Sequence, residues 1–221
     1  MTRMPNDAQT PHAIAFDFDG TLVDSAPGIL RGMAQALDSQ HIAPAVTLDR
    51  NIIGPPLRQT LVTVAGSDDP VLIAGLTRGF IRFYDDGACL DTPAFRGVVE
   101  VLTELRRRGH DLYLVTNKRG TPTRKILAHL GWTDLFKAVY CLDEHAGCPG
   151  KPQLLTQVLK AHALPPAHTP YIGDTMGDFH AATANAMPFI HAAWGYGDPP
   201  AATGRSCTRP EELLRISQFS S

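Results

Sequence analysis

Two aspartates, Asp17 and Asp19, stand one residue apart at the end of a short apolar segment, residues 13–18, and Gly20 and Thr21 follow directly. The segment is rich in residues that favour strands, and a Gly-Thr pair is typical of a tight turn. A buried strand that ends on carboxylates holds them at the rim of a sheet. The sequence therefore predicts acid chemistry at this point of the fold.

Other polar side chains also follow apolar segments. Thr116 and Asn117 come after one such segment and Asp174 after another, and Asp178 stands four residues beyond Asp174, across a predicted strand-to-helix turn. Ligands of parallel α/β sheets bind outside the carboxyl ends of the strands. We therefore expect these side chains to gather around Asp17.

Converging carboxylates repel one another unless protons or a cation intervene. Mg²⁺ prefers oxygen ligands of this kind, so Asp17, Asp174 and Asp178 are candidates for a magnesium site. The structural alternative is that Asp174 caps the following helix and that Asp178 is a solvated acid in its first turn.

Several other groups suit a phosphate. The Thr116 hydroxyl and the Asn117 amide can donate hydrogen bonds. Lys151, just before a predicted helix, can pair with a phosphate oxygen or an aspartate. The turn at Gly20 lets the backbone approach a phosphate closely.

These groups together predict a phosphoryl-transfer site. Asp17 attacks phosphorus and forms an aspartyl-phosphate. Asp19 protonates the leaving alcohol and then deprotonates the hydrolytic water. Mg²⁺ offsets the repulsion between Asp17 and the phosphate, while Lys151 and Thr116 stabilise the phosphate oxygens.

Strand and helix signals alternate along most of the chain, which predicts an α/β fold: a Rossmann-like, mostly parallel sheet with helices on both faces. Residues 13–24 and 92–221 form the predicted catalytic core domain. Residues 25–91 contain helical segments without a comparable apolar strand, which predicts a small all-helical cap domain inserted after the first strand. Residues 1–12 are polar and predict a flexible tail, not a signal peptide.

The composition excludes some partners. The chain has 20 Lys and Arg against 22 Asp and Glu, a balance that argues against nucleic-acid binding. No apolar stretch is long enough to cross a membrane, and the four cysteines match no metal or redox spacing and indicate a reducing compartment. We expect a cytoplasmic monomer or homodimer that acts on a small phosphorylated metabolite.

On these motifs the chain resembles the haloacid dehalogenase-like hydrolase superfamily, in its phosphoglycolate-phosphatase-like branch. The resemblance spans nearly the whole chain and is carried by DFDGTLVDS at 17–25, LVTNK at 114–118, GKP at 150–152 and GDTMGD at 173–178. Four motifs in the family order, each placed where a predicted strand or helix meets a loop, are far more specific than a lone D-x-D.

The resemblance implies a role for each motif residue. Asp17 is the nucleophile and a metal ligand, and Asp19 is the acid/base, with its backbone carbonyl on the metal. Asp174 is the metal-binding acid and Asp178 supports it. The remaining two motif residues, Thr116 and Lys151, position the phosphate.

The resemblance also implies that the helical insert is a small mobile cap that closes over the substrate and excludes water. Arg58 then falls near the site and can pair with a second anionic group of the substrate. The alternative for Arg58, a solvated helix residue, stays open.

The predicted activity is that of a phosphoric monoester hydrolase: Mg²⁺-dependent hydrolysis of a small, phosphoglycolate-like phosphomonoester. A phosphosugar mutase, a 5'-nucleotidase and a non-catalytic phosphate-binding module are the alternatives on the same scaffold. Asp19 argues against a dehalogenase, which lacks the second aspartate. Residues 26–91 contain no lysine, which argues against a phosphonate hydrolase that needs a cap lysine.

Overall fold

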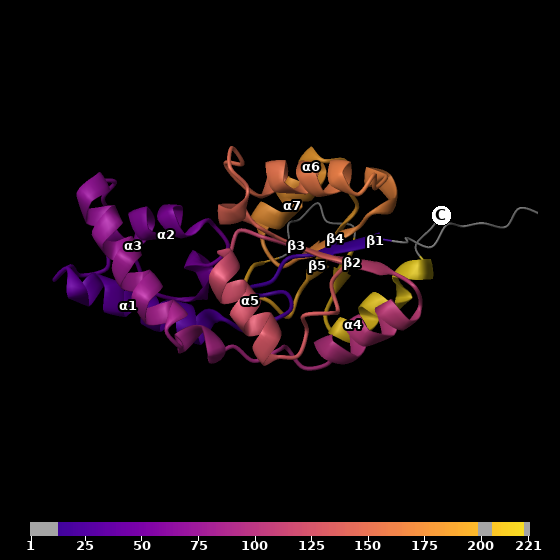
Figure 1. The fold of residues 1–221 in the computed structure, drawn as a ribbon, viewed down its shortest axis with the longest axis horizontal. Helices are drawn as coiled ribbons and strands as arrows, with labels where there is room; N and C mark the ends of the chain where they lie inside the picture. The colour runs from indigo at the N-terminus through magenta and orange to yellow at the C-terminus, as the bar shows by residue number, and fades with distance from the viewer. Residues whose placement is uncertain (1–12, 199–204, 219–221) are drawn as a thin grey trace, which may run out of the picture.

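The computed structural model describes residues 13–198 and 205–218. Its centre is a six-stranded sheet in the order β3-β2-β1-β4-β5-β6, and every pairing in it is parallel. Helices cover both faces of this sheet (Figure 1). The predicted fold class is confirmed. The predicted tail, residues 1–12, lies outside the described residues.

The strands are short, and β1, β2 and β4 are the most buried. They are β1 Ala13–Phe16, β2 Asp111–Thr116, β3 Ala138–Cys141, β4 Tyr171–Gly173, β5 Phe189–Ala192 and β6 Ser206–Cys207. β1 ends two residues earlier than predicted, because the Phe18 carbonyl accepts hydrogen bonds from three following backbone amides and so closes a turn. β6 was not predicted, since two residues carry no readable periodicity.

The core helices lie on the two faces of the sheet. They are α4 Val98–Arg107, α5 Gly120–His129, α6 Lys151–Ala161 and α7 Met176–Ala184. Side chains alternate along β1, so Ile14 and Phe16 pack with α4 and α5, while Ala13 and Ala15 pack with α6 and α7. The small residues Ala181 and Ala182 of α7 are fully buried against the sheet.

Three helices are inserted between β1 and α4, at the left of Figure 1: α1 Ala26–Ser39, α2 Leu57–Ala65 and α3 Pro70–Asp85. We call residues 26–90 the cap. The two chain passages that join the cap to the sheet run side by side, because the Asp24 amide donates to the Pro93 carbonyl and the Phe95 amide to the Leu22 carbonyl. The chain therefore enters and leaves the cap at one double-stranded point.

Short 3₁₀ helices complete the fold at Arg50–Ile52, Ala88–Leu90, Leu142–Glu144, Pro166–His168 and Pro210–Gln218. None of the helices in the described ranges is both long and apolar enough to cross a membrane.

Candidate active site

The strand order brings the predicted site residues together. β1 lies between β2 and β4 in the parallel sheet, so the carboxyl ends of all three strands share one edge. Asp17 directly follows β1, Thr116 ends β2, and Asp174 directly follows β4. All three side chains are buried. This is the edge of an open α/β sheet at which ligands bind.

Asp17, Asp174 and Asp178 form a compact cluster, which we call the acidic group. Each offers a carboxylate oxygen, and these oxygens lie within 4.8 Å of one another. Asp174 accepts hydrogen bonds from Thr21 Oγ1 at 3.0 Å and from the Tyr196 amide at 2.8 Å. Two donors from separate loops thus fix the orientation of the Asp174 carboxylate.

The acidic group is electrostatically costly. Burial, together with repulsion from Asp178 and Asp17, raises the pKa of Asp174 to about 8. Burial likewise raises the pKa of Asp17 to about 7, although Lys151 opposes the rise. An all-oxygen set of buried, mutually repelling carboxylates fits a hard divalent cation such as Mg²⁺.

Lys151 is the cation that pairs with the acidic group. It is the first residue of α6 and is almost fully buried. Its Nζ lies 2.9 Å from Asp17 Oδ1 and also forms an ion pair with Asp178. Burial opposes the charge on Lys151, but these two carboxylates outweigh it and raise its pKa. Asp17 Oδ1 accepts no well-aligned hydrogen bond. The ion pair with Lys151 is therefore the contact that positions this oxygen of the nucleophile candidate.

Asp178 has structural partners as well. Its Oδ2 accepts from the Thr175 amide at 3.0 Å and from Thr175 Oγ1 at 2.6 Å, and the pair forms a capping box at the start of α7. Thr175, not Asp174, is thus the helix cap, and Asp178 is buried instead of solvated. The structural alternative weighed for these two aspartates is therefore wrong.

Asp19 lies on the cap side of the site. Both of its carboxylate oxygens accept from Lys118 Nζ, at 2.9 and 3.2 Å, and the same Nζ donates to the Tyr84 hydroxyl at 2.7 Å. The side chain of Lys118 is buried, yet the charge of Asp19 and the contact with Tyr84 raise its pKa in spite of the desolvation. Asp19 thus contacts the cap through Lys118.

Lys118 was not among the predicted site residues. A signal was present, since it follows the end of β2 by two positions and lies at the same sheet edge as Asp19. From its position in the sequence, Lys118 could be a buried partner of Asp19 or a solvated lysine. The position of Tyr84 at the end of α3, relative to the core, decides between the two, and the sequence does not give that position.

The three predicted substrate-binding residues, Gly20, Asn117 and Arg58, differ in their surroundings. The Asn117 amide donates to the Gly54 carbonyl of the cap at 2.8 Å. Gly20 uses its amide within its own turn and lines neither cavity described below; at its positive φ of 81°, a Cβ would come within 2.2 Å of Asp174 Oδ2. Glycine is needed there for the approach of Asp174. Arg58 is exposed and lines neither cavity.

Two cavities lie where the cap meets the core. The first, which we call the cap cavity, contains Asp17, Asp19 and Thr116 on its core side and is roofed by cap residues. The second, which we call the Lys151 cavity, is lined by Lys151, Thr175 and the loop around Gly197. The two cavities share Asn117 and the start of the Gly54-Pro55 turn. The acids that could attack and protonate an ester both face the cap cavity.

The model of the family described as haloacid dehalogenase-like hydrolase matches residues 14–192. The chain belongs to this family of hydrolases. The match runs from β1 to the end of β5 and therefore contains all the motif residues described above.

Two relatives sharpen this placement within the haloacid dehalogenase-like hydrolases. The chain is 33% identical to a 5'-nucleotidase of Pseudomonas aeruginosa over 185 residues, covering 83% of each chain. It is 31% identical to a phosphoglycolate phosphatase of Rhodobacter capsulatus over 194 residues, covering 85% of this chain and 87% of the relative. The predicted resemblance to this superfamily and to its phosphoglycolate-phosphatase-like branch is confirmed.

A solved structure shares the fold. That of a predicted phosphatase from Clostridium acetobutylicum superposes with a TM-score of 0.87, at 21% identity, over 96% of this chain and 100% of the other. At this identity the likeness concerns the fold. The shared fold includes the cap, because the superposition covers 96% of this chain.

Proposed function

We propose that the protein is a Mg²⁺-dependent phosphatase that hydrolyses a small phosphomonoester through an aspartyl-phosphate on Asp17. The observation that supports this proposal most directly is the position of Asp17. It lies 2.9 Å from Lys151, within the acidic group, and faces the same cavity as Asp19. The phosphatase names of the two relatives support the same reaction class.

The first step forms a covalent bond to the enzyme. A carboxylate oxygen of Asp17 attacks phosphorus, and the bond between phosphorus and the ester oxygen breaks. The step starts with Asp19 in its protonated form, which donates its proton to that ester oxygen, so the leaving group departs as a neutral alcohol. Lys151 and the Thr116 hydroxyl bind the non-bridging oxygens and hold the phosphoryl group in line with Asp17.

The second step releases phosphate. Asp19, now ionised, accepts a proton from a water molecule, whose oxygen attacks phosphorus. The bond between phosphorus and Asp17 breaks and the carboxylate is restored. Asp17, Asp174 and Asp178 would hold Mg²⁺, which, when bound, offsets the repulsion between Asp17 and the phosphate and stabilises charge in the transition state. Thr175 and Lys151 position Asp178 for this purpose.

The test is a phosphate-release assay on wild type and Asp17→Asn, each with Mg²⁺ and with EDTA. The variant should lose turnover to background, because an amide does not replace the carboxylate as nucleophile. Its melting temperature should equal or exceed that of metal-free wild type, since the substitution removes a buried charge. Asp38→Asn, on the exposed outer face of α1, is the matched control and should keep full activity.

Turnover that survives Asp17→Asn would overturn the covalent mechanism. Wild-type activity that is unaffected by EDTA would overturn the metal requirement. Phosphate binding without release in any condition would instead favour the non-catalytic binding module.

A further inference from the structure

The roof of the cap cavity carries no charged side chain. Its large side chains are aliphatic or aromatic: Ile29, Met33, Ile52, Ile53, Leu57 and Phe80. Two hydroxyls also face it, and both are engaged. Thr60 Oγ1 donates to the Ile52 carbonyl, and the Tyr84 hydroxyl accepts from Lys118. The roof therefore offers apolar surface to whatever enters.

The two cations on the core side of the cap cavity already have acidic partners. Lys118 pairs with Asp19 at 2.9 Å. Arg119 makes two hydrogen bonds of 3.0 Å to the Asp85 carboxylate, and it lies 3.9 Å from Asp143. Within the described ranges, the cap cavity has no unpaired cation for a substrate carboxylate.

The leaving group of the substrate must lie in this cavity. Asp17 and Asp19 line the cap cavity and not the Lys151 cavity. Because Asp19 must reach the ester oxygen to protonate it, the alcohol portion extends from Asp19 toward the apolar roof.

We propose that the substrate is a phosphomonoester whose leaving alcohol is uncharged and carries an apolar ring. Such a ring removes apolar surface from water against Met33 and Phe80. A carboxylated alcohol such as glycolate would instead lose its hydration beside Asp19, with no cation to compensate it. This proposal rests on the proposed function and selects a substrate class within it.

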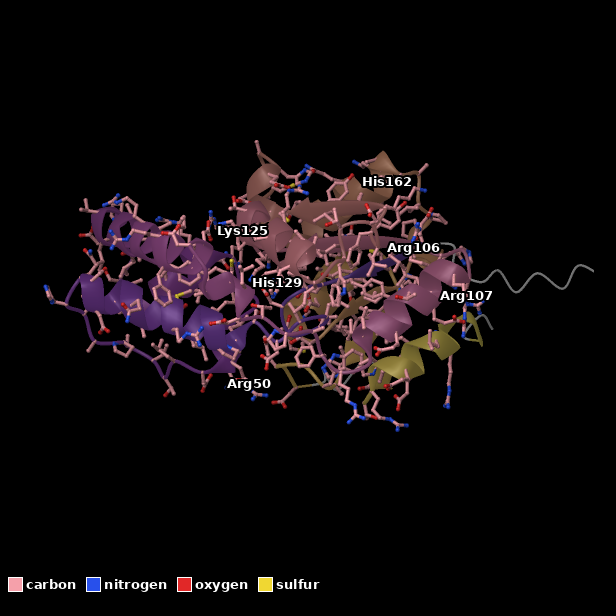
Figure 2. The ribbon with its side chains drawn as sticks, turned by 60° about the horizontal axis from the view of Figure 1, so that its bottom comes forward. Arg50, Arg106, Arg107, Lys125, His129 and His162 are labelled. Carbon is pink, nitrogen blue, oxygen red and sulfur yellow. The ribbon has the colours of Figure 1, made fainter. Side chains whose placement is uncertain are left out.

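The arginines that could recognise a substrate acid lie elsewhere. Arg50 is exposed, belongs to the lining of the Lys151 cavity, and is found at the outer edge of the molecule in Figure 2. Arg58 is exposed and lines neither cavity. Neither contributes to the lining of the cap cavity, where the leaving group would lie.

The first experiment compares kcat/KM of the full-length enzyme with Mg²⁺ for three esters: benzyl phosphate, ethyl phosphate and phosphoglycolate. We expect benzyl phosphate to exceed ethyl phosphate by about tenfold or more, since burying a ring is worth at least that factor. Phosphoglycolate should fall below ethyl phosphate. A preference for phosphoglycolate would overturn this inference and leave the phosphatase intact, whereas no turnover of any ester would overturn both.

The second experiment places a cation in the roof. Ile52→Arg, at a half-buried position of the cap, should raise kcat/KM for phosphoglycolate and lower it for benzyl phosphate, each by about tenfold. Val46→Arg puts the same charge on an exposed cap residue outside both cavities and should change neither value. Leu57→Arg, also half-buried in the lining, repeats the test if Ile52→Arg does not fold.

An unchanged ratio of the two esters in both folded roof variants would overturn the inference. Arg50→Ala gives an independent measurement. It should leave the ratio at the wild-type value, and a selective loss of phosphoglycolate turnover would show that Arg50 recognises a substrate acid after all.

Discussion

The two halves of the active site are built from different parts of the molecule. Asp17, Asp174, Asp178 and Lys151 all belong to the core, and they lie at one edge of a parallel sheet, where strands end and where α6 and α7 begin. Asp19 instead contacts Tyr84 of the cap through Lys118. The positions of these four core residues depend on the sheet, whereas the position of Asp19 depends also on where the cap lies. The residues proposed for nucleophilic attack and metal binding therefore depend on the core, whereas the residue proposed as acid/base depends also on the cap.

The polar contacts between cap and core come largely from one segment, residues 117–125. Asn117 donates to Gly54 of the cap, Arg119 binds Asp85, and Lys125 Nζ donates to the Asp85 carbonyl at 2.6 Å. Figure 2 shows Lys125 at the boundary between cap and core. Because Lys118 belongs to the same segment, a displacement of α3 would be transmitted directly to Asp19.

The largest expected effect is on the core half of the site, which consists of Asp17, Asp174, Asp178 and Lys151. Lys151→Met removes the cation between Asp17 and Asp178 and leaves two buried carboxylates facing each other. We expect a loss of about 3–5 kcal/mol in unfolding free energy, as for other broken buried pairs, together with loss of phosphatase activity. Urea unfolding in EDTA measures the first quantity.

Lys137→Met is the matched control, because Lys137 forms an exposed ion pair with Asp111. It should cost less than about 1 kcal/mol. The deficit of Lys151→Met should shrink at acid pH, where Asp17, with its raised pKa of about 7, is protonated. A deficit as small as that of the control would contradict the central position of Lys151.

The next effect concerns the cap half of the site, which consists of Asp19 with Lys118 and Tyr84. Lys118→Met removes the partner that orients Asp19, and we expect kcat to fall about a hundredfold with little change in KM, since small misplacements of a catalytic group have effects of this size. Steady-state kinetics on benzyl phosphate measures both constants. The core half should be unaffected, so Mg²⁺ should still raise the melting temperature as in wild type.

Arg119→Met provides the comparison for Lys118→Met. It breaks a neighbouring contact between cap and core, to Asp85, but no contact with Asp19. If both variants lose kcat equally, the effect comes from cap docking alone and the specific role of Lys118 is refuted.

The core half could be predicted from sequence, and the reason is geometric. Parallel strands carry their carboxyl ends to one edge, so residues that follow apolar segments, such as Asp17, Thr116 and Asp174, had to lie near one another once the strand order was of this type. The position of Lys151 at a helix start was readable from the following proline. The bound of β1 differs from the prediction by two residues, because hydrogen bonds at the end of the strand decide it.

The cap half could not be predicted in the same way. The Lys118 contact depends on where Tyr84 lies after three helices and their turns have packed. Arg58 was expected near the substrate, yet the phase of α2 leaves it exposed. Gly20 was expected to approach a phosphate, and the close approach that it permits is to Asp174. Contacts across an insertion depend on packing that local patterns do not encode.

The smallest expected effect reports on the acidic group alone. In the metal-free protein, the pKa of Asp174 is about 8 against an ordinary 3.8, so the folded state binds more protons than the unfolded state between these values. Stability from this group is therefore present at low pH and is lost as pH rises toward 8. Mg²⁺ binds the ionised carboxylates, so its stabilising effect should grow across the same interval.

Melting temperatures with and without Mg²⁺ at pH 6.0 and pH 8.5 test this expectation. The increase caused by Mg²⁺ should be several degrees larger at pH 8.5, because each kcal/mol corresponds to about 2–4 °C for a chain of this size. Asp174→Asn should abolish most of the Mg²⁺ effect and its pH dependence, whereas Lys118→Met should retain both. An equal increase at the two pH values would mean that the carboxylates are already ionised without metal, and a loss of the Mg²⁺ effect in Lys118→Met would mean that the two halves are not separable.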